Sequence, residues 1–147
     1  MDYQEILKNL APCGLDCSRC VNYAHGEVKE LSGSLGSALQ GFDKIAAMVK
    51  DWLPVMNGYP QFTQVLEFFQ QASCNGCRAG GFQPPFCAAR TCFREKGVDF
   101  CFQCGEYPCN RNQYPENLAA QWRANNDRMK EVGVETFYKE QKLNPRY

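Results

Sequence analysis

Residues 74–109 read CNGCRAGGFQPPFCAARTCFREKGVDFCFQCGEYPC, and this stretch holds seven of the ten cysteines in the 147-residue chain. Most of the ten form close groups, and the full set is Cys13, Cys17, Cys20, Cys74, Cys77, Cys87, Cys92, Cys101, Cys104 and Cys109. Two thiolates separated by two residues can face one metal ion from a tight turn. A secreted disulfide scaffold usually spreads its cysteines along the chain to staple many loops, so this pairing favours metal binding.

Glycine accompanies both pairs that have two intervening residues. Gly76 lies inside the CNGC pair, and Gly105 directly follows the CFQC pair. Glycine frees the backbone to fold its N–H groups toward the sulfur atoms. This composition is typical of zinc knuckles and has no simple role in a helix.

The first three cysteines have the spacing C-x3-C-x2-C, which on a helix would place Cys13, Cys17 and Cys20 on one stripe. The same spacing occurs in the cluster-binding motif of radical S-adenosylmethionine enzymes. Those enzymes resemble full or partial β/α barrels, which need repeated strands that this chain lacks. We therefore expect no radical chemistry from these three thiols.

The charge balance argues against nucleic acid and membranes as partners. Sixteen Lys and Arg residues face sixteen Asp and Glu residues, so the formal charge is zero, and acids are interspersed with the arginines of the cysteine block. The longest apolar runs are far shorter than a membrane span. Residues 1–13, MDYQEILKNLAPC, do not resemble a signal sequence. We expect a cytoplasmic protein, in a compartment where thiols stay reduced.

Apolar periodicity predicts helices on both sides of the cysteine-rich stretch. Residues 42–53 and 62–72 carry apolar side chains at helical spacing, which we assign to the core, and residues 27–40 predict a helix weakened by two glycines. Residues 115–133 and 134–142 predict two more helices. The only histidine, His25, is interpreted as a polar residue at a helix start rather than as a ligand.

Strand signals are nearly absent, because the chain has few runs of β-branched residues and no hairpin dipeptide between alternating apolar residues. The predicted fold is therefore mainly α, a small single domain over residues 1–147. It consists of short helices with cysteine zinc knuckles and little or no β-sheet.

Three segments together resemble a known family. CGLDCSRC at 13–20, CNGC at 74–77 and FCAARTCFREKGVDFCFQCGEYPCN at 86–110 are similar to the cysteine-rich family called domain of unknown function 3795. Family members often carry a further cysteine shortly before the position of Cys87, where this chain has two prolines, so one ligand of the family pattern is missing. The resemblance implies zinc binding and no established activity.

Ten thiols divide most simply into two four-cysteine zinc sites with two thiols left over, so we expect two zinc ions. One partition joins Cys74, Cys77, Cys87 and Cys92, leaving Cys101, Cys104 and Cys109 to join Cys17 or Cys20. An interleaved partition brings Cys74 and Cys77 to Cys101 and Cys104. The two spare thiols are candidates for a redox or metal-transfer role.

The leading functional hypothesis is a small interaction module stabilised by zinc. Phe82, Phe86, Phe100, Phe102 and the segment 106–108 would present an aromatic surface to a protein partner, or would instead form a core that covers the metal sites. The alternative is an iron–sulfur cluster or redox-active thiol protein, acting as an electron carrier or enzyme. We assign no catalytic residue, and the sequence indicates neither a biological role nor an oligomeric state.

Overall fold

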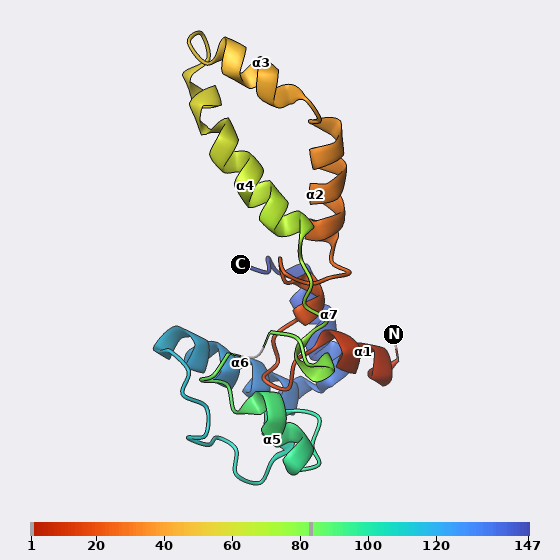
Figure 1. The fold of residues 1–147 in the computed structure, drawn as a ribbon. Coiled ribbons are helices and arrows are strands. Elements are labelled where there is room, and N and C mark those ends of the chain that lie inside the picture. Colours follow the sequence, from red (N-terminus) through yellow and green to blue (C-terminus); the bar gives the residue numbers. More distant parts are fainter. Residues whose placement is uncertain (1, 83) are drawn as a thin grey trace. The chain divides into compact units, whose positions relative to one another are not determined.

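The computed structural model describes residues 2–82 and 84–147, and over these residues the chain forms helices and no β-sheet (Figure 1). Extended backbone pairs in this part of the chain only as two isolated bridges, Leu10 with Asp16 and Tyr23 with Cys74. The mainly α class predicted from the sequence is confirmed. No described helix is both long enough and apolar enough to span a membrane.

The chain divides into two compact units, which we describe separately. The segments up to Ser18 and from Asn75 to Tyr147 form one unit, here called the cysteine unit, and Arg19–Cys74 form the other, here called the helical unit. No signal in the sequence indicated this division. It arises because the two halves of the cysteine unit meet across a long insertion.

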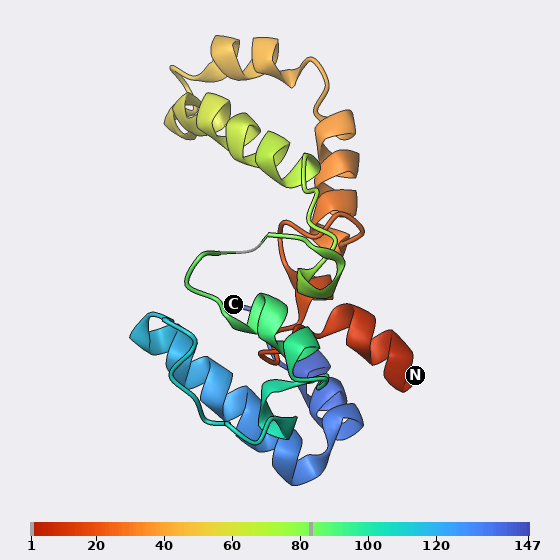
Figure 2. The ribbon, with the colours of Figure 1, turned by 60° about the horizontal axis from the view of Figure 1, so that its bottom comes forward.

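The described residues of the cysteine unit form four α-helices: α1 (Tyr3–Asn9), α5 (Ala89–Glu95), α6 (Glu116–Val132) and α7 (Val134–Leu143). Short 3-10 turns lie at its cysteines, namely η1 (Cys17–Arg19), η3 (Cys77–Ala79) and η4 (Cys101–Gln103). Gly133 separates α6 from α7 with a φ of 83°, a left-handed value that favours glycine. The two C-terminal helices predicted from the sequence are confirmed, and Figure 2 shows them meeting at an angle.

Two buried clusters hold the cysteine unit together. The first joins α1, α6 and α7 and consists of Ile6, Leu10, Phe100, Met129, Val134, Phe137 and Tyr138. The second consists of Ala11, Cys13, Cys87, Ala89 and Trp122, with further cysteines packed against it. Cysteines are therefore part of the core of this unit.

The helical unit contains α2 (Glu27–Ala38), α3 (Phe42–Val49), the 3-10 turn η2 (Pro54–Gly58) and α4 (Tyr59–Gln70). Gly33 and Gly36, the two glycines expected to weaken this helix, do not interrupt α2. A Cβ at Gly36 would lie 2.0 Å from Nε2 of Gln70. Because Gly36 has no side chain, this nitrogen can reach the carbonyl oxygen of Ser32 and donates to it at 3.0 Å. The glycine therefore allows α4 to pack closely against α2.

Half of the apolar side chains that the sequence assigned to the core of the helical unit are exposed. Ala46, Leu66 and Ala72 are buried as predicted, whereas Trp52 is 79% exposed and Leu53 is 51% exposed. The assignment of whole faces to the core is therefore wrong. Periodicity shows which residues share a face but does not show what that face contacts.

Candidate functional site

Eight of the ten cysteines lie in the cysteine unit, and the other two, Cys20 and Cys74, lie in the helical unit. The expected stripe of three thiols on one helix is not formed, because the structure places a turn at Gly14 and only a short 3-10 turn from Cys17. His25 also lies in the helical unit, where its ring contacts that of Tyr23 at a centroid distance of 5.9 Å.

Four cysteines of the cysteine unit line one small cavity: Cys92, Cys101, Cys104 and Cys109. Its volume is about 20 Å³, which is enough for about one water-sized sphere. Phe93, Val98 and Tyr107 supply the apolar wall. This grouping differs from both partitions predicted from the sequence, because it places Cys92 of α5 with the three cysteines that follow.

The backbone of the CFQC pair turns toward its sulfur. The Cys104 N–H donates to the carbonyl oxygen of Cys101 at 3.1 Å, and the Glu106 N–H donates to Sγ of Cys104 at 3.5 Å. An N–H group directed at a sulfur is the feature expected of a knuckle. Gly76 has a φ of 88°, whereas Gly105 has no positive φ, so only the first pair needs its glycine.

Trp122 of α6 covers Cys101. Burial raises the pKa of the Cys101 thiol to about 11, while the interaction with the Trp122 side chain acts in the opposite direction. The Nε1 atom of Trp122 is buried and makes no hydrogen bond within the described part of the chain. A buried donor without an acceptor is costly, and a thiolate at Cys101 would supply the acceptor.

The other four cysteines of this unit, Cys13, Cys17, Cys77 and Cys87, also interact with one another. A hydrogen bond joins the Cys17 and Cys77 side chains, lowering the pKa of Cys17 to about 6 and raising that of Cys77. The pKa of Cys13 is raised to about 12, chiefly by burial and to a smaller extent by the neighbouring Cys87 and Cys17. The Cys87 sulfur lies 3.1 Å from the Tyr114 hydroxyl.

The backbone near Cys13 is fixed by α6. Asn126, which is fully buried, donates to the carbonyl oxygens of Cys13 at 3.0 Å and Trp122 at 2.9 Å. Its Oδ1 accepts a hydrogen bond from the Phe102 N–H at 3.0 Å. One side chain therefore positions the first cysteine and the CFQC turn together.

Asp16 fixes the other end of the same loop. Its buried carboxylate accepts hydrogen bonds from the Ser18 N–H at 3.0 Å and the Ser18 hydroxyl at 2.6 Å. The ammonium of Lys142 lies 3.0 Å from Oδ2 of Asp16, and Nε of Arg146 donates to the Asp16 carbonyl oxygen at 3.2 Å. Residues from α7 and the C-terminus thus hold the backbone on either side of Cys17.

Arg78, which directly follows Cys77, points into the unit. Its guanidinium donates to the carbonyl oxygens of Leu10 at 2.9 Å and Asp99 at 2.5 Å. It also lies 5.1 Å from the ring centroid of Phe93 and 5.0 Å from that of Phe100. In the sequence this arginine is one of several basic residues of the cysteine block, and no pattern indicated that it would position a cysteine turn.

The four phenylalanines that were predicted to form an aromatic surface are only partly exposed. Phe100 is fully buried and stacks on Phe102 at a centroid distance of 6.1 Å, and Phe86 packs edge-on against Tyr114 at 6.3 Å. Phe82 is 71% exposed. Phe100 and Phe102 pack in the cluster that contains no cysteine, whereas Phe86 packs against the cluster with Cys13 and Cys87.

Among residues 2–82 and 84–147, no three side chains of His, Cys, Asp and Glu are arranged as a metal-binding group. The acids near the first cavity make ion pairs, since Glu106 pairs with Lys96 and Glu95 pairs with Arg111. Zinc binding by the ten cysteines stays a prediction at this point.

The model of one protein family, described as a protein of unknown function (DUF3795), matches residues 9–114. No curated protein and no solved structure matches the chain. The matched range includes all ten cysteines and ends before α6.

Proposed function

Because the chain belongs to the DUF3795 family, which is described without a function, we propose from the chain's own residues that it is a zinc-binding protein. Cys92, Cys101, Cys104 and Cys109 are the proposed ligands of a structural zinc ion. A structural zinc ion is held by four protein ligands, and four thiolates are one of its common ligand sets.

The observation that carries this proposal is that all four side chains line a single small cavity. A space of about 20 Å³ suits one ion better than a four-iron cluster. The surrounding Phe93, Val98 and Tyr107 would limit the access of water, as expected of a structural site with no open position.

The electrostatic surroundings support thiolate ligands. A zinc ion with four thiolates carries a net charge of about −2. Lys96 and Arg111 both line the cavity, where Glu106 and Glu95 pair with them, so their positive charge beside the cavity is partly offset. The buried Nε1–H of Trp122 would gain an acceptor when Cys101 is ionised. Hydrogen bonds and charges of this kind hold metal-bound side chains in place.

A second zinc ion would use the other four thiols of the cysteine unit, Cys13, Cys17, Cys77 and Cys87. Their mutual interactions and the buried supports at Asn126 and Arg78 favour this set. Two zinc ions per chain would then leave Cys20 and Cys74 of the helical unit outside both sites.

A redox-active thiol protein is the second candidate. The hydrogen bond between Cys17 and Cys77 favours it, because a thiol with a lowered pKa beside a second thiol is the arrangement of a reactive pair. In that case the two cysteines would form a reversible disulfide instead of binding zinc.

Elemental analysis and native mass spectrometry of protein purified without oxygen test the proposal. We expect two zinc ions in the wild type, one in Cys104→Ser, and two in the matched control Cys20→Ser. Iron in place of zinc, or no metal with a Cys17–Cys77 disulfide, would overturn it. Equal loss of zinc from both variants would show that the ligand set is wrong.

A further inference from the structure

The helical unit exposes most of its large apolar side chains. They lie on all three of its α-helices and on the connection from α3 into η2: Leu31, Leu35, Ile45, Met48, Trp52, Leu53, Val55, Phe62, Val65 and Phe68. Exposed apolar residues scattered singly are normal in soluble proteins, but contiguous patches above a few hundred Å² mark interaction sites.

These residues form rows and are not scattered. Ile45, Met48 and Trp52 follow one another at spacings of three and four along and just beyond α3. On α4, Phe62 and Val65 are three residues apart. Residues at this spacing lie on one face of a helix. Each helix therefore presents an apolar row that its own unit leaves uncovered.

The helices of this unit leave a groove between them. An open groove of about 570 Å³ lies among residues of α2, the start of α3 and α4, including Gly33, Asp43 and Leu66. The buried apolar side chains of the unit are Ala46, Leu66 and Ala72, so contacts within the unit leave much of its apolar surface uncovered.

The summed exposed area of these rows is comparable with that of a stable interface. Aromatic side chains bury about 150–250 Å² each, and a half-exposed large apolar residue offers on the order of 100 Å². The ten exposed residues together offer about 1,000 Å². A standard interface buries about 800 Å² on each partner.

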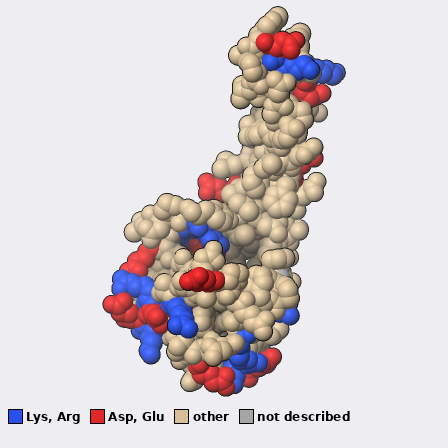
Figure 3. Space-filling model, turned by 90° about the vertical axis from the view of Figure 1, so that its left-hand side faces the viewer, with Lys and Arg blue, Asp and Glu red and all other residues tan. Residues whose placement is uncertain are grey.

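The charges beside the α3 row indicate which partner fits. Asp43, Lys44, Lys50 and Asp51 lie at its two ends, two of each sign. Figure 3 shows Lys and Arg next to Asp and Glu at the end of this unit, with uncharged surface below them. An anionic membrane or a strongly charged partner would favour a surface of one sign. A balanced set of charges can pair with its own copy.

We propose that the helical unit binds the helical unit of a second copy of this chain through these apolar rows. A two-fold arrangement presents the same patch from both copies, so acids of one can lie against lysines of the other. The proposal is independent of zinc binding in the cysteine unit.

Sedimentation velocity of the full, metal-loaded chain over a range of concentrations tests the proposal. We expect a dimer for the wild type and an unchanged dimer for the control Leu143→Glu. The double variant Met48→Glu/Trp52→Glu should have a dimer dissociation constant at least about tenfold higher than that of the wild type. Leu143 is 86% exposed but lies on α7 of the cysteine unit. A monomeric wild type, or an unchanged dimer in the double variant, would overturn the proposal.

A charge exchange provides a test that does not depend on the folding of the apolar variant. Asp43→Lys/Asp51→Lys and Lys44→Asp/Lys50→Asp should each dimerise less than the wild type, and an equal mixture should restore the dimer. No restoration in the mixture would count against a second copy as the partner. Binding of a monomeric wild type to anionic phospholipid vesicles would instead identify a membrane surface.

Discussion

The side-chain amide of Asn126 donates a hydrogen bond to the carbonyl oxygen of Cys13 at 3.0 Å, across 113 positions of the sequence. The same side chain accepts a hydrogen bond from the Phe102 N–H, so it connects both cysteine segments to α6. The family match ends before this helix. Residues outside the matched range therefore position cysteines within it.

Replacing Asn126 with Ala should destabilise the protein by about 2–4 kcal/mol, because buried backbone groups at Cys13 and Phe102 would lose their partner. Urea unfolding followed by circular dichroism measures the change. The exposed Asn117 provides the control, and its replacement with Ala should alter stability by less than about 0.5 kcal/mol. Equal effects of the two changes would show that the Asn126 contacts contribute little.

Gly14→Ala should destabilise the protein more than Gly41→Ala. Both glycines have a positive φ, 85° and 82°, so both variants incur backbone strain. Only at Gly14 would the new Cβ also clash, at 2.7 Å from Cβ of Asn125. The difference between the two free energies of unfolding isolates this clash, and we expect about 1–3 kcal/mol. No difference would mean that α6 can move away from the Cys13 loop.

Helix positions near the C-terminus could be predicted from the sequence because their signals are local. Pro115 precedes α6 and Gly133 ends it, and the apolar spacing lies between them. The close cysteine pairs were equally visible. The grouping of Cys92 with Cys101, Cys104 and Cys109 was not, because it depends on where α5 lies in space relative to the segment that carries the other three.

The helical unit shows a second limit of sequence patterns. An amphipathic row such as Ile45, Met48 and Trp52 predicts a helix with a face to cover, and that part of the prediction is confirmed. The pattern is the same whether the face is covered by the chain's own core or by a partner. Only the exposed fractions of these side chains separate the two cases.

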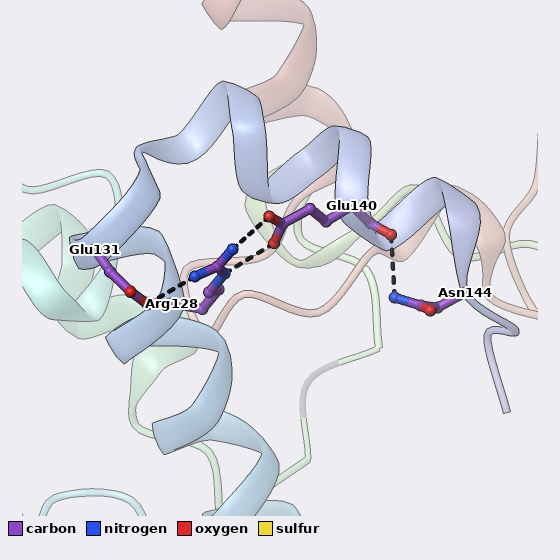
Figure 4. A network of polar contacts seen from close by, with 4 residues as sticks. All are labelled: Arg128, Glu131, Glu140 and Asn144. Atoms are coloured by element: carbon purple, nitrogen blue, oxygen red, sulfur yellow. Dashed lines mark hydrogen bonds and ion pairs between the residues drawn. The ribbon is translucent and has the colours of Figure 1, made fainter.

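The ion pair between α6 and α7 should make stability depend on pH. Figure 4 shows Arg128 donating to both carboxylate oxygens of Glu140 and to Glu131. The hydrogen bond from Arg128 lowers the pKa of Glu140 below its usual value. A lowered pKa means that the stabilisation is present above the unfolded-state pKa of about 4.3 and is lost as the pH falls through the folded-state value.

Unfolding of the wild type and Glu140→Gln at pH 7 and pH 3 checks this. The wild type should be the more stable at pH 7, and the difference should shrink toward zero at pH 3. Glu131→Gln serves as the control, because Glu131 is more exposed and accepts a single bond from Arg128. A difference that persists at pH 3 would show that the carboxylate charge is not its cause.

Trp122→Phe should weaken zinc binding by more than its cost to the stability of the metal-free protein, which is measured alongside by urea unfolding. The variant keeps an aromatic ring near Tyr107 and Tyr114, whose centroids lie 5.3 Å and 6.0 Å from that of Trp122. It removes the buried N–H that makes no hydrogen bond in the described structure. Loss of a donor to a metal-bound thiolate typically costs about 10- to 100-fold in metal affinity. The smaller ring also leaves a cavity, which costs both the metal-free and the zinc-bound protein about 1–3 kcal/mol of stability. Competition with a chromogenic chelator measures the affinity, with Trp52→Phe, which changes a largely exposed tryptophan, as the control. Equal zinc affinity in the two variants would mean that the Trp122 N–H does not face a metal-bound sulfur, and would count against Cys101 as a ligand.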